Sequence, residues 1–162
     1  MSEHQAKVHW ARGAGEAFTD SRYSRAHVWE FDGGVAVPAS SAVSSVPLPY
    51  SKAENVDPEE ALVAAISSCH MLTFLYLAAK ARLVVDSYED QAVGHMAKNA
   101  AGRKAITTVQ LSPRIVFSGA REPTDAEVQH LHHAAHEECY IANSVSTEIS
   151  VAGEWSFSAR RP

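Results

Sequence analysis

The chain has 162 residues, with 14 Lys and Arg against 19 Asp and Glu and a formal net charge of −5. This length fits one domain with a buried core, so we expect a single domain over residues 1–162. The basic residues form no run that would follow a phosphate backbone, which argues against nucleic acid as a partner.

The N-terminal part of the chain predicts a short antiparallel meander. Val8 and Trp10 alternate with polar neighbours, and residues 25–31 are rich in aromatic and β-branched types. The sequence Asp-Gly-Gly at 32–34 is typical of a turn. Residues 38–55 are rich in Ser and Pro, which favours a loop that could border a pocket.

A helix start follows this loop. Asp57 can accept from the first free backbone donors, Pro58 has the φ of a first helical position, and Glu60 has the spacing of a capping box. The residues up to about 83 are apolar on nearly every face. We therefore expect a central helix surrounded by protein.

Part of this helix approaches the length of a membrane span. Residues 61–79 are close to the roughly 20 that cross a bilayer. Their middle, however, reads Ser-Ser-Cys-His at 67–70, where unpaired polar groups in lipid would be costly. We expect a buried soluble helix with no membrane partner and, because residues 1–10 do not resemble an export signal, a cytoplasmic location.

The second half predicts strands around a second helix. Residues 84–95 and 106–117 resemble two paired strands joined across 99–102, whose residue types suit a hairpin. A second capping box starts a helix at Thr124. Alternating apolar residues from 145 to 157 mark a last strand.

The chain has only two cysteines, Cys69 and Cys139. In a reducing compartment such a pair is more often catalytic, metal-binding or buried than a permanent crosslink. Each lies on the inward stripe of its helix, so packed helices could bring their Cα atoms within the roughly 4–7 Å that a disulfide needs. Simple burial of each thiol is the alternative, and a reactive thiol there would need a nearby cation.

Two segments resemble the OsmC/Ohr hydroperoxide reductases. Residues 57–70 resemble the family's Pro-Glu followed ten residues later by a peroxidatic Cys in a long central helix, and residues 135–144 resemble its resolving Cys at a helix end. The resemblance implies an α+β fold, with antiparallel β-sheets packed around two central helices in an intertwined homodimer. His70, and the sequence Tyr-Ile-Ala-Asn at 140–143, depart from the commonest family patterns.

The resemblance also implies a cysteine-based peroxidase that reduces organic hydroperoxides to alcohols. Cys69 would form a sulfenic acid and then a disulfide with Cys139, and Glu59 would orient an active-site arginine. Arg25 fits the family position of that arginine best, and Arg22 second. No bound cofactor is implied, and the reductant would be a dithiol, in the family a lipoylated protein.

The spacing of Glu59 and Cys69 adds a constraint on that site. Ten residues at a rise of about 1.5 Å separate them by roughly 15 Å along one helix. Either a long arginine bridges part of this gap or a second subunit brings the carboxylate to the thiol, which argues for a dimer.

Two other functions remain open. Four histidines, at 130, 132, 133 and 136, crowd the second helix, and the i, i+4 spacing of His132 and His136 is compatible with a shared zinc or copper ion. The chain could also be a non-catalytic stress-response dimer whose cysteines are merely packed.

Overall fold

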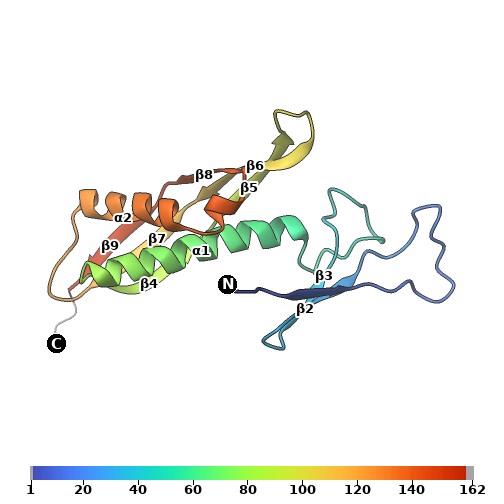
Figure 1. Ribbon diagram of the computed structural model, residues 1–162, viewed down its shortest axis with the longest axis horizontal. Coiled ribbons are helices and arrows are strands. Elements are labelled where there is room, and N and C mark those ends of the chain that lie inside the picture. The colour runs from blue at the N-terminus through green and yellow to red at the C-terminus, as the bar shows by residue number, and fades with distance from the viewer. Residues whose placement is uncertain (1, 160–162) are drawn as a thin grey trace. The chain divides into compact units, whose positions relative to one another are not determined.

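The computed structural model describes residues 2–159 and divides into two compact units, residues up to 61 and residues from 62 onward. This division does not show whether either unit folds by itself, so the single domain over residues 1–162 stays a prediction. The strands, the two long helices α1 and α2, and the short 3₁₀ helix η1 can be followed by label and colour in Figure 1.

The first unit contains a three-stranded antiparallel sheet, which confirms the predicted meander. β1 (Ala6–His9) pairs with β2 (His27–Phe31), and β2 pairs with β3 (Ala36–Ala39). The turn between β2 and β3 closes through hydrogen bonds from Gly34 N to Phe31 O and from Phe31 N to Val35 O, both 2.9 Å. β3 enters the segment that we expected to be a loop, because its backbone pairs with β2 despite the Ser- and Pro-rich composition.

Helix α1 (Pro58–Lys80) begins where the sequence predicts. Asp57 Oδ1 accepts from the backbone N of Glu60 at 2.8 Å, and Glu60 Oε2 accepts from Asp57 N at 3.1 Å. The helix ends about three residues before the expected position. Arg82 adopts a left-handed φ of 59°, and Leu83 N then bonds back to Ala78 O at 3.0 Å, which closes the last turn.

The burial of α1 differs from the expectation. Its fully buried residues recur every four positions as Ile66, His70, Phe74 and Ala78. By contrast, Leu72 is 62% and Tyr76 58% exposed, so the described residues of the second unit cover one face of the helix rather than all of them. By length and composition α1 could cross a membrane, a test that the core helix of a soluble protein also passes.

Six strands of the second unit form two three-stranded sheets, with strand orders β4-β7-β9 and β5-β6-β8. Their bounds are β4 Val84–Asp90, β5 Val93–Lys98, β6 Lys104–Leu111, β7 Pro113–Ser118, β8 Glu148–Val151 and β9 Glu154–Ser158. The predicted pairing around residues 99–102 is confirmed, since β4 pairs with β7 and β5 with β6, both antiparallel. The pairs β6–β8 and β7–β9 are parallel, which the expectation of antiparallel sheets did not include.

Each predicted long strand is divided in two, and the breaks lie together. Asp90 Oδ1, at the end of β4, accepts from Ser112 N between β6 and β7 at 2.6 Å. Ala152 N, between β8 and β9, donates to Leu111 O at 2.9 Å. The chain thus passes from one sheet to the other three times, between β4 and β5, between β6 and β7 and between β8 and β9. Contacts between these strands fix the bends.

Helix α2 (Asp125–Glu138) begins at the predicted capping box, with Thr124 and Glu127 bonding each other's backbone N–H. Its buried stripe, Val128, Leu131 and Ala135, packs with Phe74 of α1 and with β7 in one hydrophobic cluster. The figure shows α1 and α2 running beside each other along the sheets (Figure 1). This packing places the end of α2 beside the middle of α1.

Candidate dithiol site

The two cysteines meet between the helices of the second unit. Cys69 lies in the middle of α1 and is partly exposed, whereas Cys139 follows the last residue of α2 and is 1% exposed. Both are free thiols, and a side-chain hydrogen bond joins them. The two cysteines therefore lie next to each other in the structure, as their positions on the inward faces of the two helices allowed.

The surroundings of Cys139 favour its protonated form. Burial, and then the hydrogen bond to Cys69, raise the pKa of the Cys139 thiol, while the backbone N–H groups of Ile141 and Ala142 act in the opposite direction. Ala142 N lies 3.4 Å from Cys139 Sγ, at the start of η1 (Ala142–Ser144). The buried thiol is thus poised to donate a hydrogen bond to its more exposed neighbour.

A groove of about 480 Å³ opens at Cys69. One wall comes from α1 and includes Ser68, Cys69 and Leu72. The other wall comes from Glu138, Tyr140 and Ile141. Most of the lining is aliphatic or aromatic, with Glu138 as the one carboxylate among the lining residues. A small organic molecule entering this groove would meet the sulfur of Cys69 on a largely apolar surface.

His70, which follows Cys69 in α1, pairs with His132 of α2. His70 Nε2 and His132 Nδ1 are 3.1 Å apart, and the His132 ring packs on Phe74 with centroids 4.5 Å apart. Burial lowers the pKa of both imidazoles to about 4, helped at His70 by His136 and opposed by Asp90, and helped at His132 by His70. Near neutral pH the pair is therefore uncharged.

The histidine cluster does not form the ligand set that the alternative of zinc or copper binding requires. His130 and His133 are exposed on α2, whereas His132 faces His70. Among residues 2–159, no group of three or more His, Cys, Asp or Glu side chains is arranged to hold a metal ion.

The arginines and the glutamate of the predicted site belong to the first unit. Arg25 Nη1 donates to Ser21 O at 2.8 Å and to Tyr23 O, and its guanidinium lies 3.7 Å from the centroid of the Tyr23 ring. Arg22 Nε donates to the Tyr50 hydroxyl at 3.1 Å. Glu59 is the second residue of α1 and is partly buried.

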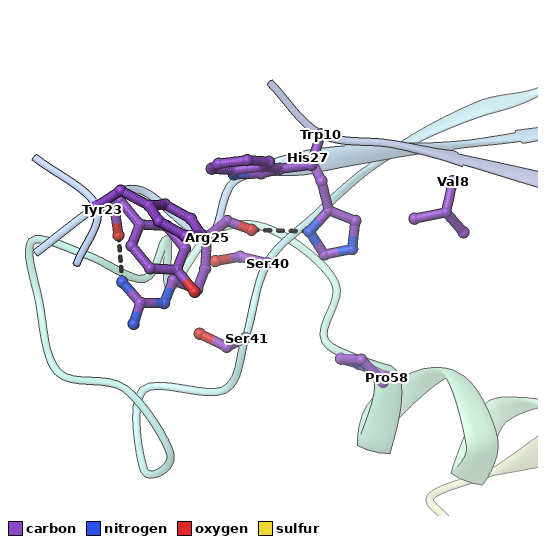
Figure 2. Close-up of a pocket in the computed structure, with 9 residues that line it drawn as sticks. Val8, Trp10, Tyr23, Arg25, His27, Ser40, Ser41 and Pro58 are labelled. Carbon is purple, nitrogen blue, oxygen red and sulfur yellow. Dashed lines mark hydrogen bonds between the residues drawn. The ribbon is translucent and has the colours of Figure 1, made fainter. Parts of the chain in front are cut away.

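Arg25 also lines a cavity of about 420 Å³ in this unit. Figure 2 shows its guanidinium over Tyr23, with Ser40 and Ser41 from the Ser-rich loop beside it and the His27 ring bonded to the backbone of Arg25. The loop thus borders a pocket, as its composition allowed. Of the two candidate arginines, Arg25 lines this cavity and Arg22 is exposed.

Three features of the site were not identified from the sequence. They are the histidine pair, the groove at Cys69, and the backbone donors at residues 141 and 142. The pair joins positions 62 residues apart, and the groove depends on how α1 packs against the segment after α2. A local sequence signal existed only for His70, as an unusual polar residue in an apolar helix.

The fold and the meeting of a groove-lining cysteine with a buried one define a small α+β dithiol protein. Residues 51–153 match the family model described as OsmC-like protein, which covers more than half of the chain. The chain therefore belongs to the OsmC-like family.

Solved structures agree with this family. An OsmC-like protein of unknown function from Vibrio cholerae is 55% identical, with a TM-score of 0.93 over 95% of this chain and 100% of that chain. An organic hydroperoxide resistance protein from Elizabethkingia anophelis is 16% identical, with a TM-score of 0.65 over 98% of each chain. OhrB, the organic hydroperoxide resistance protein of Bacillus subtilis, is 16% identical, with a TM-score of 0.56 over 96% of this chain and 98% of that chain. None of the curated proteins compared matches this chain.

Proposed function

We propose that this protein is a thiol-dependent peroxidase that reduces organic hydroperoxides to alcohols. The observation that carries the proposal is a hydrogen-bonded pair of free thiols: Cys69 lines a largely apolar groove, and its partner Cys139 is buried. Membership of the OsmC-like family, and a shared fold with proteins named for organic hydroperoxide resistance, support the same function.

The exposures of the two thiols support distinct roles. Cys69 is accessible from the groove, so its thiolate would attack the terminal peroxide oxygen, break the O–O bond and become a sulfenic acid, while the alkoxide takes a proton and leaves as alcohol. Cys139 is held next to it as a protonated thiol. Its sulfur would then displace water from the sulfenic acid and form the disulfide.

The remaining parts of the proposed site come from the first unit. A guanidinium at Arg25 would stabilise the Cys69 thiolate, and Glu59 would hold that guanidinium by a charge-assisted hydrogen bond. The ten-residue interval between Glu59 and Cys69 favours a homodimer in which a second copy helps to complete the site. We place the protein in the cytoplasm, where an external dithiol, in the family a lipoylated protein, would reduce the disulfide.

Mass spectrometry with one equivalent of cumene hydroperoxide tests the proposal. The wild type should lose two hydrogens as a Cys69–Cys139 disulfide forms. Cys69→Ser should consume no peroxide, and Cys139→Ser should consume one equivalent and stop at a sulfenic or over-oxidised Cys69. Equal and full activity of both variants would refute the roles assigned to the two cysteines. Thiols that do not respond to the peroxide would instead indicate a non-catalytic dimer.

The choice of arginine has its own test. Arg25→Ala should slow the reaction of Cys69 with peroxide by about 10- to 100-fold, because the thiolate loses its neighbouring cation. Arg22→Ala is the matched variant, and stopped-flow rates of peroxide consumption compare the two. A full rate in Arg25→Ala together with a loss in Arg22→Ala would assign the role to Arg22.

A further inference from the structure

We infer that the external dithiol attacks the Cys69 sulfur of the disulfide and that Cys139 is the leaving thiolate, held by the backbone donors of residues 141 and 142. The inference rests on the proposed function and specifies how the oxidised site is regenerated. It makes the groove at Cys69 the entrance for both peroxide and reductant.

Access to the two sulfurs differs sharply. Cys139 is 1% exposed, enclosed between the end of α2 and the segment that follows it. Cys69 lines the 480 Å³ groove together with Leu72 and Tyr76. Thiol–disulfide exchange requires the incoming sulfur to reach a disulfide sulfur, so access selects Cys69 as the atom attacked.

Two local hydrogen bonds offset part of the effect by which burial disfavours a thiolate at Cys139, so access selects the sulfur that is attacked and these bonds assist the departure of the other. A leaving thiol departs faster when its thiolate is stabilised. Ala142 N points at Cys139 Sγ from 3.4 Å, and the backbone of Ile141 also bonds this sulfur. Once the disulfide opens at Cys69, these N–H groups face the negative charge that develops on Cys139.

The exchange balances with a dithiol alone. One thiolate of the dithiol forms a bond to Cys69 Sγ, and the Cys69–Cys139 bond breaks with its electron pair on Cys139. The second thiol of the reductant then attacks the mixed disulfide, releases the Cys69 thiolate and leaves as the oxidised cyclic disulfide. A proton from solvent or from the reductant restores the Cys139 thiol.

Asn143 positions the backbone donors. Its side-chain N donates to Glu137 O at 2.8 Å and to Cys139 O at 3.0 Å, and its backbone N donates to Cys139 O at 3.0 Å. These bonds fix the turn that aims Ala142 N at the sulfur. Asn143 is thus a positioning residue and not a group that touches the reductant.

Trapping the mixed disulfide tests which sulfur is attacked. The full-length protein is oxidised with diamide, which forms the disulfide without a peroxide, then exposed briefly to glutathione and quenched with acid and N-ethylmaleimide. Peptide mass spectrometry should find glutathione on Cys69 and maleimide on Cys139 at the earliest times. Glutathione first on Cys139 would overturn the inference. Failure of peroxide to oxidise the pair would count against the proposed function alone.

Reduction kinetics give a second measurement. Asn143→Ala should slow dithiothreitol reduction of the diamide-formed disulfide by about 3- to 10-fold, the effect expected for weakening one hydrogen bond to a charged group. Alkylation of reduced Cys69 by iodoacetamide should keep its rate. Asn99→Ala, in the hairpin between β5 and β6, is the matched control. An unchanged reduction rate, or an equal slowing of both reactions, would contradict the leaving-group role.

Discussion

At the scale of single residues, the pair His70 and His132 replaces an apolar contact in the core with a hydrogen bond between two imidazoles. Such a bond needs one ring to donate and the other to accept, which two neutral rings satisfy. Burial enforces the same state, because an imidazolium there would lose its hydration and lie close to His136. The pair is thus sensitive to acid.

The stability of the protein should therefore fall between pH 6.5 and pH 4. Both histidines have their pKa lowered from 6.5 to about 4 on folding, so in this window the unfolded chain binds more protons than the folded one. Their stabilising effect is complete above pH 6.5 and is lost as the pH falls through 4. For His70 alone, the free energy of unfolding should fall by about 3 kcal/mol across this window. Urea unfolding at a series of pH values measures it.

A matched pair of variants isolates this effect from the carboxylates that titrate in the same range. His132→Gln keeps a polar side chain but takes up no proton, so its stability should depend on pH less steeply, by up to about 1.4 kcal/mol per pH unit. His130→Gln changes an exposed histidine of the same helix and should keep the slope of the wild type. Equal slopes in all three proteins would show that the buried pair does not titrate on unfolding.

At the scale of elements, the bends that divide the strands are fixed by close contacts. Gly153, between β8 and β9, lies against Pro113 at the start of β7: a Cβ at Gly153 would lie 2.8 Å from the Pro113 carbonyl oxygen and 2.7 Å from its ring. The backbone oxygen cannot move without disturbing the pairing of β7 with β4 and β9. Only a residue without Cβ fits this crossing.

Gly153→Ala should consequently destabilise the protein by about 1–3 kcal/mol, the usual cost of forcing an extra carbon into a packed site. Gly33→Ala is the control, because a Cβ there would meet nothing within 4 Å. Chemical denaturation of the two variants gives the comparison. Equal stability of both would mean that the strands can separate at the bend without cost.

At the scale of the whole molecule, helix α1 presents apolar side chains that the described residues of the second unit leave exposed. Leu72 and Tyr76 are more than half exposed, one turn apart on the same helix face. Exposed apolar surface of this kind is typical of an interface between proteins. It supports the proposed homodimer, and because both side chains also line the groove at Cys69, the second copy would border that groove without closing it.

We expect the protein to be a dimer at micromolar concentration, as measured by light scattering during size-exclusion chromatography. Leu72→Glu should shift it toward monomer, because a carboxylate would lose its hydration in the interface. Ala126→Glu adds the same charge at an exposed position of α2 and should leave the dimer intact. A wild type that elutes as a monomer at every concentration, with Leu72→Glu unchanged, would contradict the homodimer.

The sequence by itself determined what depends on local chemistry. The capping boxes at Asp57 and Thr124 fixed the starts of both helices, because each is satisfied within four residues. The stripe that ends at Cys139 correctly predicted its burial, since helical periodicity fixes which residues share a face. The same periodicity indicated that Cys69 and Cys139 could lie close together if the two helices pack.

Only the tertiary structure decided what depends on contacts between distant residues. The strand breaks depend on Asp90 reaching Ser112 and on Gly153 passing Pro113, and no local pattern reports such contacts. The His70–His132 bond and the groove at Cys69 likewise arise where α1 packs against α2 and the segment after it. Hydrophobic periodicity indicates which face of an element turns inward, but packing determines which side chain lies opposite.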